Sequence, residues 1–246
     1  MLKPVVTPPR SKVVFDQLLA QILGGQLEPG AALPSERALC GILKVNRGAV
    51  REALKRLHQA HLIDVHHGGT TRVLDYRDNA GTELLPELLM SPGGTLDVGI
   101  VRGMIEMRAV LAPDVARLCA LRGGPAVVAK LSAVVLAMEA AGGDPPTLHR
   151  LTFEFWKALV DGSQNTPYCL IFNSLRQLYA KVEDVLANLL IDELSDLPAY
   201  RAITHAVAAG DADAARDRAA RLIQRGADRL YEVLEMLERM NRGRKR

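Results

Sequence analysis

The sequence predicts a mainly α-helical protein of two domains: three helices with a β-hairpin, followed by an all-α antiparallel helical bundle. The β-like runs lie before residue 77, after three segments with helical periodicity. From residue 79 onward the apolar segments have helical spacing, and Gly- and Pro-rich breakers separate them. The charge balance changes at the same place. Residues 1–77 carry 11 Lys and Arg against 6 Asp and Glu, whereas residues 78–238 carry 15 against 22.

The N-terminal segment follows the order helix, helix, turn, helix, hairpin. Apolar positions at Val14, Leu18 and Ile22 predict the first helix. Ser35 is suited to cap the second helix, because its side-chain oxygen can accept a hydrogen bond from an unpaired backbone N–H. The predicted helices span 12–24, 35–43 and 47–60, and the predicted strands span 62–67 and 71–76.

Beyond the hairpin the sequence predicts helices alone. They span 80–90, 97–121, 125–141, 146–161, 167–191, 196–209 and 211–240. We therefore divide the chain into an N-terminal domain (1–77), a linker with a short helix (78–96) and an all-helical domain (97–246).

Composition excludes several classes of protein. Hydrophobic residues make up 48% and charged residues 24% of the chain, which is typical of a globular protein. The N-terminus lacks the apolar region of a secretory signal, and no apolar run is long enough to span a membrane. The cysteines lack disulfide or metal-ligand spacing (Cys40, Cys119, Cys169). We expect a cytoplasmic protein that has no membrane partner.

The third predicted helix has two distinct faces. Val50, Ala53 and Leu57 lie on an apolar stripe, and Arg47 and Arg51 lie on another face, four residues apart. Such a helix suits the major groove of DNA, where arginine can bond to guanine with two hydrogen bonds. The alternative is an ordinary solvated face, and the spacing alone leaves both interpretations open.

Four motifs follow one another across this region: Pro29-Gly30, Leu33-Pro34-Ser35-Glu36-Arg37, Val45-Asn46-Arg47 and Val50-Arg51-Glu52-Ala53-Leu54. Together they closely resemble the GntR family of bacterial regulators. The resemblance implies a winged helix-turn-helix in which Arg37, Arg47 and Arg51 contact DNA. Asn46 stands where serine is usual and can still cap the helix, and Gly48 leaves room for a close backbone approach. It also implies a homodimer on a short palindromic operator in double-stranded DNA.

The segment from His66 to Val73 resembles the wing of the fatty-acid-responsive branch of this family. By that resemblance His67 and Gly68 enter the minor groove. The region holds four of the six histidines, so a zinc site is the alternative (His58, His61, His66, His67). Adjacent residues of a strand point to opposite faces, which argues against that site.

Glu106 and Arg108 precede an Ala-rich helical run, a pattern that resembles the FCD domain of the FadR-type branch. Many FCD domains bind a divalent metal through one Asp and three His. The resemblance places those positions on residues that are poor ligands or none: Thr152, Trp156, Tyr200 and Leu222. We therefore expect no metal and no cofactor, with His149 and His205 as the substitute ligands to consider.

Arg108 falls in the middle of the apolar stripe of helix 97–121, where a guanidinium needs an anionic partner. The partner is either a carboxylate of the bundle or the acid group of a ligand. We expect a small acidic effector, such as a fatty acid or acyl-CoA, with an organic acid, a sugar acid or no ligand as alternatives. The residues expected to contact it are Arg108, Thr152, Trp156, Asn165 and Tyr200.

These features predict a transcriptional regulator that acts as a repressor. The chain has no P-loop, GxSxG, HExxH or Gly-rich dinucleotide turn, which argues against an enzyme. A winged helix used for protein or RNA contacts is the rival interpretation. The arginines in DNA-reading positions argue against it.

Overall fold

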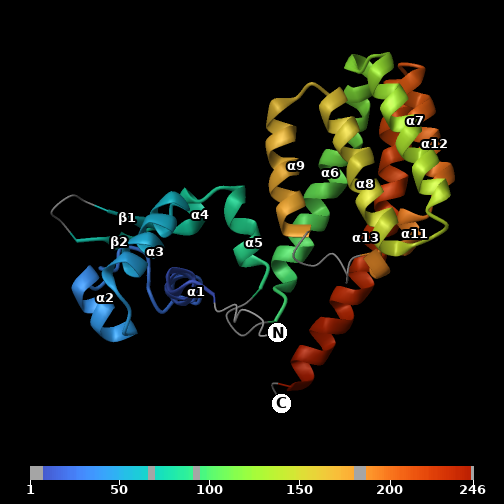
Figure 1. Ribbon diagram of the computed structural model, residues 1–246. Coiled ribbons are helices and arrows are strands. Elements are labelled where there is room, and N and C mark those ends of the chain that lie inside the picture. The colour runs from blue at the N-terminus through green and yellow to red at the C-terminus, as the bar shows by residue number, and fades with distance from the viewer. Residues whose placement is uncertain (1–7, 66–69, 91–94, 180–186, 245–246) are drawn as a thin grey trace, which may run out of the picture. The chain divides into compact units, whose positions relative to one another are not determined.

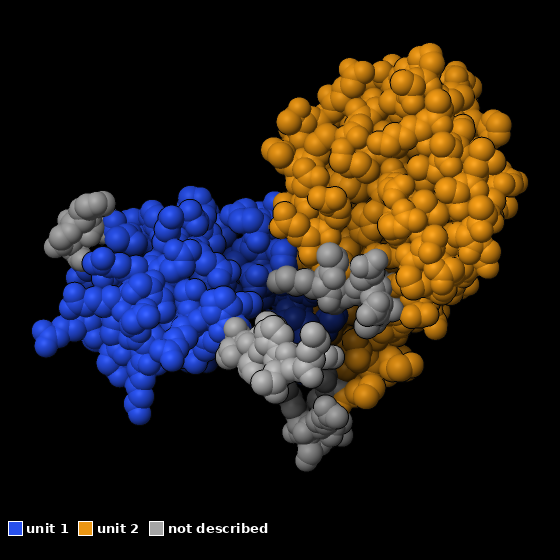
Figure 2. Space-filling model, in the orientation of Figure 1, with its two compact units in different colours: residues 1–96 blue, residues 97–246 orange. Residues whose placement is uncertain are grey.

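The computed structural model describes residues 8–65, 70–90, 95–179 and 187–244 and is mainly helical, as predicted (Figure 1). It divides into two compact units, residues 1–96 and 97–246, which are coloured separately in Figure 2. Each unit has its own hydrophobic core. Within the described ranges, no helix combines the length and the apolar composition needed to cross a membrane.

The first unit contains the predicted three helices and hairpin. Its helices are α1 (Arg10–Leu23), α2 (Glu36–Leu43) and α3 (Arg47–Gln59), and its strands are β1 (Ile63–Asp64) and β2 (Arg72–Val73). The strands are antiparallel, with Ile63 opposite Val73. Ser35 caps α2 as predicted, since its Oγ accepts a hydrogen bond from the Ala38 N–H at 3.2 Å.

The predicted strand over 71–76 is wrong at its C-terminal end. Asp75 instead caps a short helix, α4 (Tyr76–Asn79), because its Oδ1 accepts a hydrogen bond from the Arg77 N–H at 2.9 Å. The hydrogen bond to the Asp75 carboxylate favours a helix at this point over a continuation of the strand.

The helix predicted over 80–90 is also interrupted. A 3₁₀ turn, η1 (Thr82–Leu84), leads into α5 (Leu85–Leu88), and Gly81 before them is extended. Leu84 is only 2% exposed and belongs to the core of the first unit. Residues 78–96, expected to be a linker, cluster with that unit.

The second unit consists of helices in its described residues. They are α6 (Val98–Arg122), α7 (Pro125–Ala140), α8 (Pro145–Gly162), α9 (Thr166–Tyr179), α11 (Ile191–Leu194), α12 (Leu197–Ala208) and α13 (Ala212–Arg244). Aspartates accept hydrogen bonds from backbone N–H groups at four helix starts (Asp97, Asp144, Asp196, Asp211). These caps explain why α6, α8, α12 and α13 start close to where the sequence predicts.

The long helix α13 packs along α6, and α7, α8 and α12 complete the core (Figure 1). The helix predicted over 167–191 is found only in part. It is α9 up to Tyr179, residues 180–186 lie outside the described residues, and Leu190 takes a non-helical conformation before α11. This arrangement leaves α6, α8, α9 and α11 around one interior space.

Candidate DNA-reading surface and ligand cavity

Helix α3 separates its apolar and basic residues as its periodicity indicates. Val50, Ala53 and Leu57 are completely buried, whereas Arg47 and Arg51 are exposed. Arg37 is exposed on α2, the helix that precedes α3. The buried stripe fixes the rotation of α3 in the unit, so the arginine face is free to meet a polyanion.

Glu36 of α2 holds the guanidinium of Arg51 from α3. The Arg51 Nε donates to Glu36 Oε2 at 2.8 Å, and the two side chains are 67% and 41% exposed. An ion pair this exposed adds little stability, about 0–1 kcal/mol. Its effect is to restrict the directions in which Arg51 points.

Two local features form the turn between α2 and α3: a left-handed residue and a side-chain cap. Lys44 ends α2 in the left-handed conformation, with φ at 52°. Asn46 then caps α3, since its Oδ1 accepts a hydrogen bond from the Ala49 N–H at 2.8 Å. A Cβ on Gly48 would meet Asn46 Oδ1 at an ordinary 3.5 Å, so the fold itself does not require glycine there.

The base of the hairpin is tied to the rest of the first unit. The Arg72 Nη1 donates to the Gly30 carbonyl at 2.8 Å, and the Gly30 N–H donates to the Val73 carbonyl at 2.8 Å. His67 and Gly68, the residues predicted at the wing tip, lie outside the described residues. The wing tip therefore remains a prediction from the resemblance.

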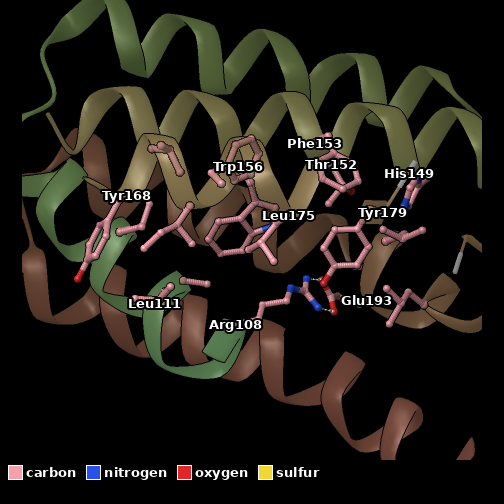
Figure 3. Close-up of a pocket in the computed structure, with 17 residues that line it drawn as sticks. Arg108, Leu111, His149, Thr152, Phe153, Trp156, Tyr168, Leu175, Tyr179 and Glu193 are labelled. Atoms are coloured by element: carbon pink, nitrogen blue, oxygen red, sulfur yellow. Dashed lines mark hydrogen bonds and ion pairs between the residues drawn. The ribbon is translucent and has the colours of Figure 1, made fainter. Parts of the chain in front are cut away.

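In the second unit, a cavity of about 90 Å³ lies among α6, α8, α9 and α11. Aliphatic and aromatic side chains form most of its wall. Figure 3 shows Tyr168 and His149 toward opposite ends of the lining residues, with Trp156 between them. The described part of the wall contains one cation and one carboxylate, which are Arg108 and Glu193.

Arg108 and Glu193 form a buried ion pair with two hydrogen bonds (Figure 3). The Arg108 Nη1 donates to Glu193 Oε2 at 3.0 Å, and Nη2 donates to Oε1. The Glu193 side chain is 0% exposed and that of Arg108 is 16% exposed. Burial opposes the charge on Arg108, but the Glu193 carboxylate raises the pKa of Arg108 above its ordinary value. Of the two partners considered for Arg108, the structure contains the carboxylate of the bundle.

Gly226 on α13 makes the space that Glu193 occupies. A Cβ at this position would lie 1.8 Å from Glu193 Oε2 and 3.1 Å from Leu190 Cδ2. The close approach of the α13 backbone therefore depends on glycine. In this way α6, α11 and α13 meet at one ion pair.

Replacing Gly226 by alanine is expected to destabilise the protein by about 1–3 kcal/mol, because the added methyl group displaces a buried, paired carboxylate. Helix propensity alone predicts the opposite sign, a gain of about 1 kcal/mol. Gly103 on α6 is the matched control, since a Cβ there meets nothing within 4 Å. Urea unfolding of both variants is the measurement, and equal stabilisation of both would contradict the assigned role of Gly226.

The four residues that the resemblance places at metal-ligand positions are Thr152, Trp156, Tyr200 and Leu222, and all four are buried. Thr152 Oγ1 and Tyr200 OH are 3.2 Å apart and hydrogen-bonded, and burial raises the pKa of Tyr200. Leu222 is buried in the hydrophobic core. Across the described ranges, no cluster of three or more His, Cys, Asp or Glu is placed to hold a metal. His149 is buried at the cavity wall, and His205 is exposed on α12.

Trp156 brings an unused hydrogen-bond donor to the cavity. The side chain is 7% exposed and lines the cavity from α8. Among the described residues, its indole Nε1 has no hydrogen-bond partner. A buried donor without an acceptor is unfavourable by about 1–3 kcal/mol, so a bound molecule with an acceptor would relieve this cost.

The structure brings three of the five predicted effector contacts to the cavity: Arg108, Thr152 and Trp156. Tyr200 is fully buried beside Phe155, with ring centroids 4.9 Å apart, and is not part of the cavity wall. Asn165 also has another role, because its Oδ1 accepts a hydrogen bond from the Tyr168 N–H at 3.3 Å near the start of α9.

Sequence reasoning missed Glu193 and Phe153 as cavity residues. Glu193 had a usable signal, because Leu190 and Leu194 place it on the apolar side of a short helix. Phe153 had a weaker one, since an aromatic residue at helical spacing is ordinary in a core.

Comparison with known proteins identifies both units. Residues 10–73 match the bacterial regulatory proteins of the gntR family, and residues 103–225 match the FCD domain. The chain is 36% identical over 233 residues to the HTH-type transcriptional regulator Mce2R of Mycobacterium tuberculosis (strain CDC 1551 / Oshkosh), covering 95% of this chain and 96% of that protein.

Two further similarities are more distant. The fatty acid metabolism regulator protein of Serratia proteamaculans (strain 568) is 26% identical over 167 residues, covering 68% of each chain. The solved structure of Lar, which controls the expression of the Listeria monocytogenes agr system, has a TM-score of 0.58 at 17% identity, covering 94% of this chain and 99% of that one. The second similarity is one of fold.

The matched family consists of DNA-binding regulators rather than enzymes, and its two domains correspond to the two structural units. The chain therefore belongs to the GntR family of bacterial regulatory proteins and is a transcriptional regulator with a helix-turn-helix domain and an FCD domain.

Proposed function

We propose that this regulator is a homodimeric repressor in the cytoplasm, and that a small acidic molecule with an apolar body modulates its binding to DNA. Two copies of α3 read the half-sites of a short palindromic operator, one helical turn apart. Arg37, Arg47 and Arg51 are the proposed DNA contacts, because their side chains are exposed on α2 and α3. Asn46 and Gly48 lie at the start of α3 and are the proposed backbone contacts.

The observation that carries the effector proposal is the apolar wall of the cavity, to which Trp156 contributes. An apolar wall with few polar groups is typical of sites for hydrophobic ligands. A sugar acid would need several polar partners, and the cavity wall offers few. The Serratia relative is named a fatty acid metabolism regulator protein, and this name supports the choice of a fatty acid or its acyl-CoA.

Trp156 is the single tryptophan of the chain, so its fluorescence reports directly on the cavity. Titration of the wild-type protein with dodecanoate and dodecanoyl-CoA is expected to change this fluorescence and to change operator affinity in parallel. A fluorescence change without any effect on operator affinity would contradict the regulatory role. A reporter gene placed behind the operator tests whether the protein represses or activates transcription. We expect the bound protein to lower expression of this gene.

Replacing Trp156 by phenylalanine should weaken ligand binding about 5- to 10-fold, because the smaller ring loses about 1–1.5 kcal/mol of apolar contact with the part of the ligand inside the cavity. The free protein should keep or gain stability, since the variant removes a buried donor without a partner. Calorimetric titration measures the affinity, and urea unfolding measures the stability. An unchanged affinity would exclude Trp156 as a ligand contact.

A further inference from the structure

A second hollow adjoins the cavity on the outside of the helical unit. It is formed by residues of α7, α8 and α9, and it shares three wall residues with the cavity: His149, Phe153 and Phe172. The ring centroids of Phe153 and Phe172 are 6.1 Å apart, and those of Phe153 and His149 are 5.0 Å apart. Three aromatic side chains therefore separate an apolar interior from this outer hollow.

The outer hollow is basic. Four cations line it, from three different helices: Lys130, Arg150, Lys157 and Arg176. Of the residues that the structure describes, one acidic residue lies in its wall, Glu154, which pairs with Arg150.

One more carboxylate lies near the hollow, and it leaves the positive charge in excess. Asp161 pairs with Lys157 and lies 4.0 Å from Lys130. Arg176 has no acidic partner among the described residues. Among the described residues, four cations thus face two carboxylates, and this surplus attracts an anion to the surface.

The inner cavity does not offer such a surplus. Arg108 is already neutralised by Glu193 through two hydrogen bonds, and the pair is buried. An anion placed beside it would lose its hydration and would compete with a fixed carboxylate. The cavity therefore suits the uncharged part of a ligand, and the outer hollow suits its charge.

We propose that the effector is an amphiphile whose apolar chain fills the cavity and whose anionic head rests in the basic hollow formed by Lys130, Arg150, Lys157 and Arg176. The chain passes the aromatic wall at Phe153, and its head never reaches Arg108. This inference rests on the proposed function and assigns the head group to a surface of the FCD domain instead of its interior.

The test compares a head-group variant with a charge-matched control. The variant Lys157→Gln/Arg176→Gln removes two cations from the hollow, and Arg216→Gln/Arg229→Gln removes two exposed cations from α13. Neither pair changes Trp156, so fluorescence titration remains the readout for every protein. The probes are dodecanoyl-CoA, dodecanoate and the uncharged dodecanol, each below its micelle concentration.

The head-group variant should bind dodecanoyl-CoA at least 10-fold more weakly than wild type, and its binding should depend less on salt. Its affinity for dodecanol should stay within 2-fold of wild type, and the control should match wild type for all probes. Weakened binding of dodecanoate as well would identify a single carboxylate as a sufficient head. Weakened binding of the thioester alone would identify a polyphosphate head.

Equal affinities of wild type and the head-group variant for both anionic probes would overturn the head-group assignment while leaving the proposed function intact. The same conclusion would follow if Arg108→Met weakened binding of the anionic probes but not of dodecanol, while the head-group variant left the binding of all probes unchanged. Failure of every probe to alter Trp156 fluorescence would instead overturn the proposed function, and this inference with it.

Discussion

Replacing Arg47 by alanine is expected to weaken specific operator binding about 10- to 100-fold, because a bidentate contact to guanine contributes about 1–3 kcal/mol. Arg47 is exposed at the first position of α3, and its truncation leaves the buried stripe of Val50, Ala53 and Leu57 intact. Folding and assembly should therefore be unchanged. Fluorescence anisotropy on a duplex selected from random sequence by the wild-type protein measures the loss.

The control for Arg47 is Arg229→Ala, which removes an equal charge from an exposed position on α13. It should leave specific binding within 2-fold of wild type. Binding to unrelated duplexes distinguishes a base contact from a phosphate contact, since only the former should relax the sequence preference. Undiminished operator binding by Arg47→Ala at physiological salt would mean that α3 is not the reading helix.

Replacing Arg108 by alanine is expected to lower the free energy of unfolding by about 3–5 kcal/mol, because Glu193 is left charged and buried without its partner. Glu193 is 0% exposed and packs against the backbone at Gly226, so it cannot turn toward water. Urea unfolding of the full chain, monitored by circular dichroism, measures the change.

The double variant Arg108→Met/Glu193→Leu distinguishes charge from packing. It replaces the pair by apolar side chains of similar size, and it should recover most of the stability that Arg108→Ala loses. The single variant Glu193→Gln should lie between these two, since it keeps hydrogen-bond acceptors at the same place. A loss below about 1 kcal/mol for Arg108→Ala would show that water reaches the pair.

Local signals in the sequence were enough to predict helix α3 and its exposed arginine face. The apolar residues of α3 recur at helical spacing, and the cap at Asn46 depends on a donor only three residues away. Such interactions are set by neighbours along the chain, so they are visible without the fold. The order of helices and hairpin followed from the same kind of signal.

The cavity depended on contacts that are remote in sequence. The charge on Arg108 predicted an anionic partner, but Glu193 lies 85 residues away, and only tertiary packing could choose it over a ligand. Tyr200 was expected at the cavity because the resemblance to FCD domains places a metal-ligand position there. It turned instead toward Thr152, whose hydroxyl satisfies the buried phenol.

If a ligand in the FCD cavity changes the protein's affinity for DNA, as proposed, then the two binding events are thermodynamically linked, and this linkage can be measured. Dodecanoyl-CoA affinity should be measured through Trp156 with and without saturating operator, and operator affinity with and without saturating dodecanoyl-CoA. We expect both affinities to change by the same factor, about 5- to 150-fold. Binding of both partners with no mutual effect would contradict the proposed linkage.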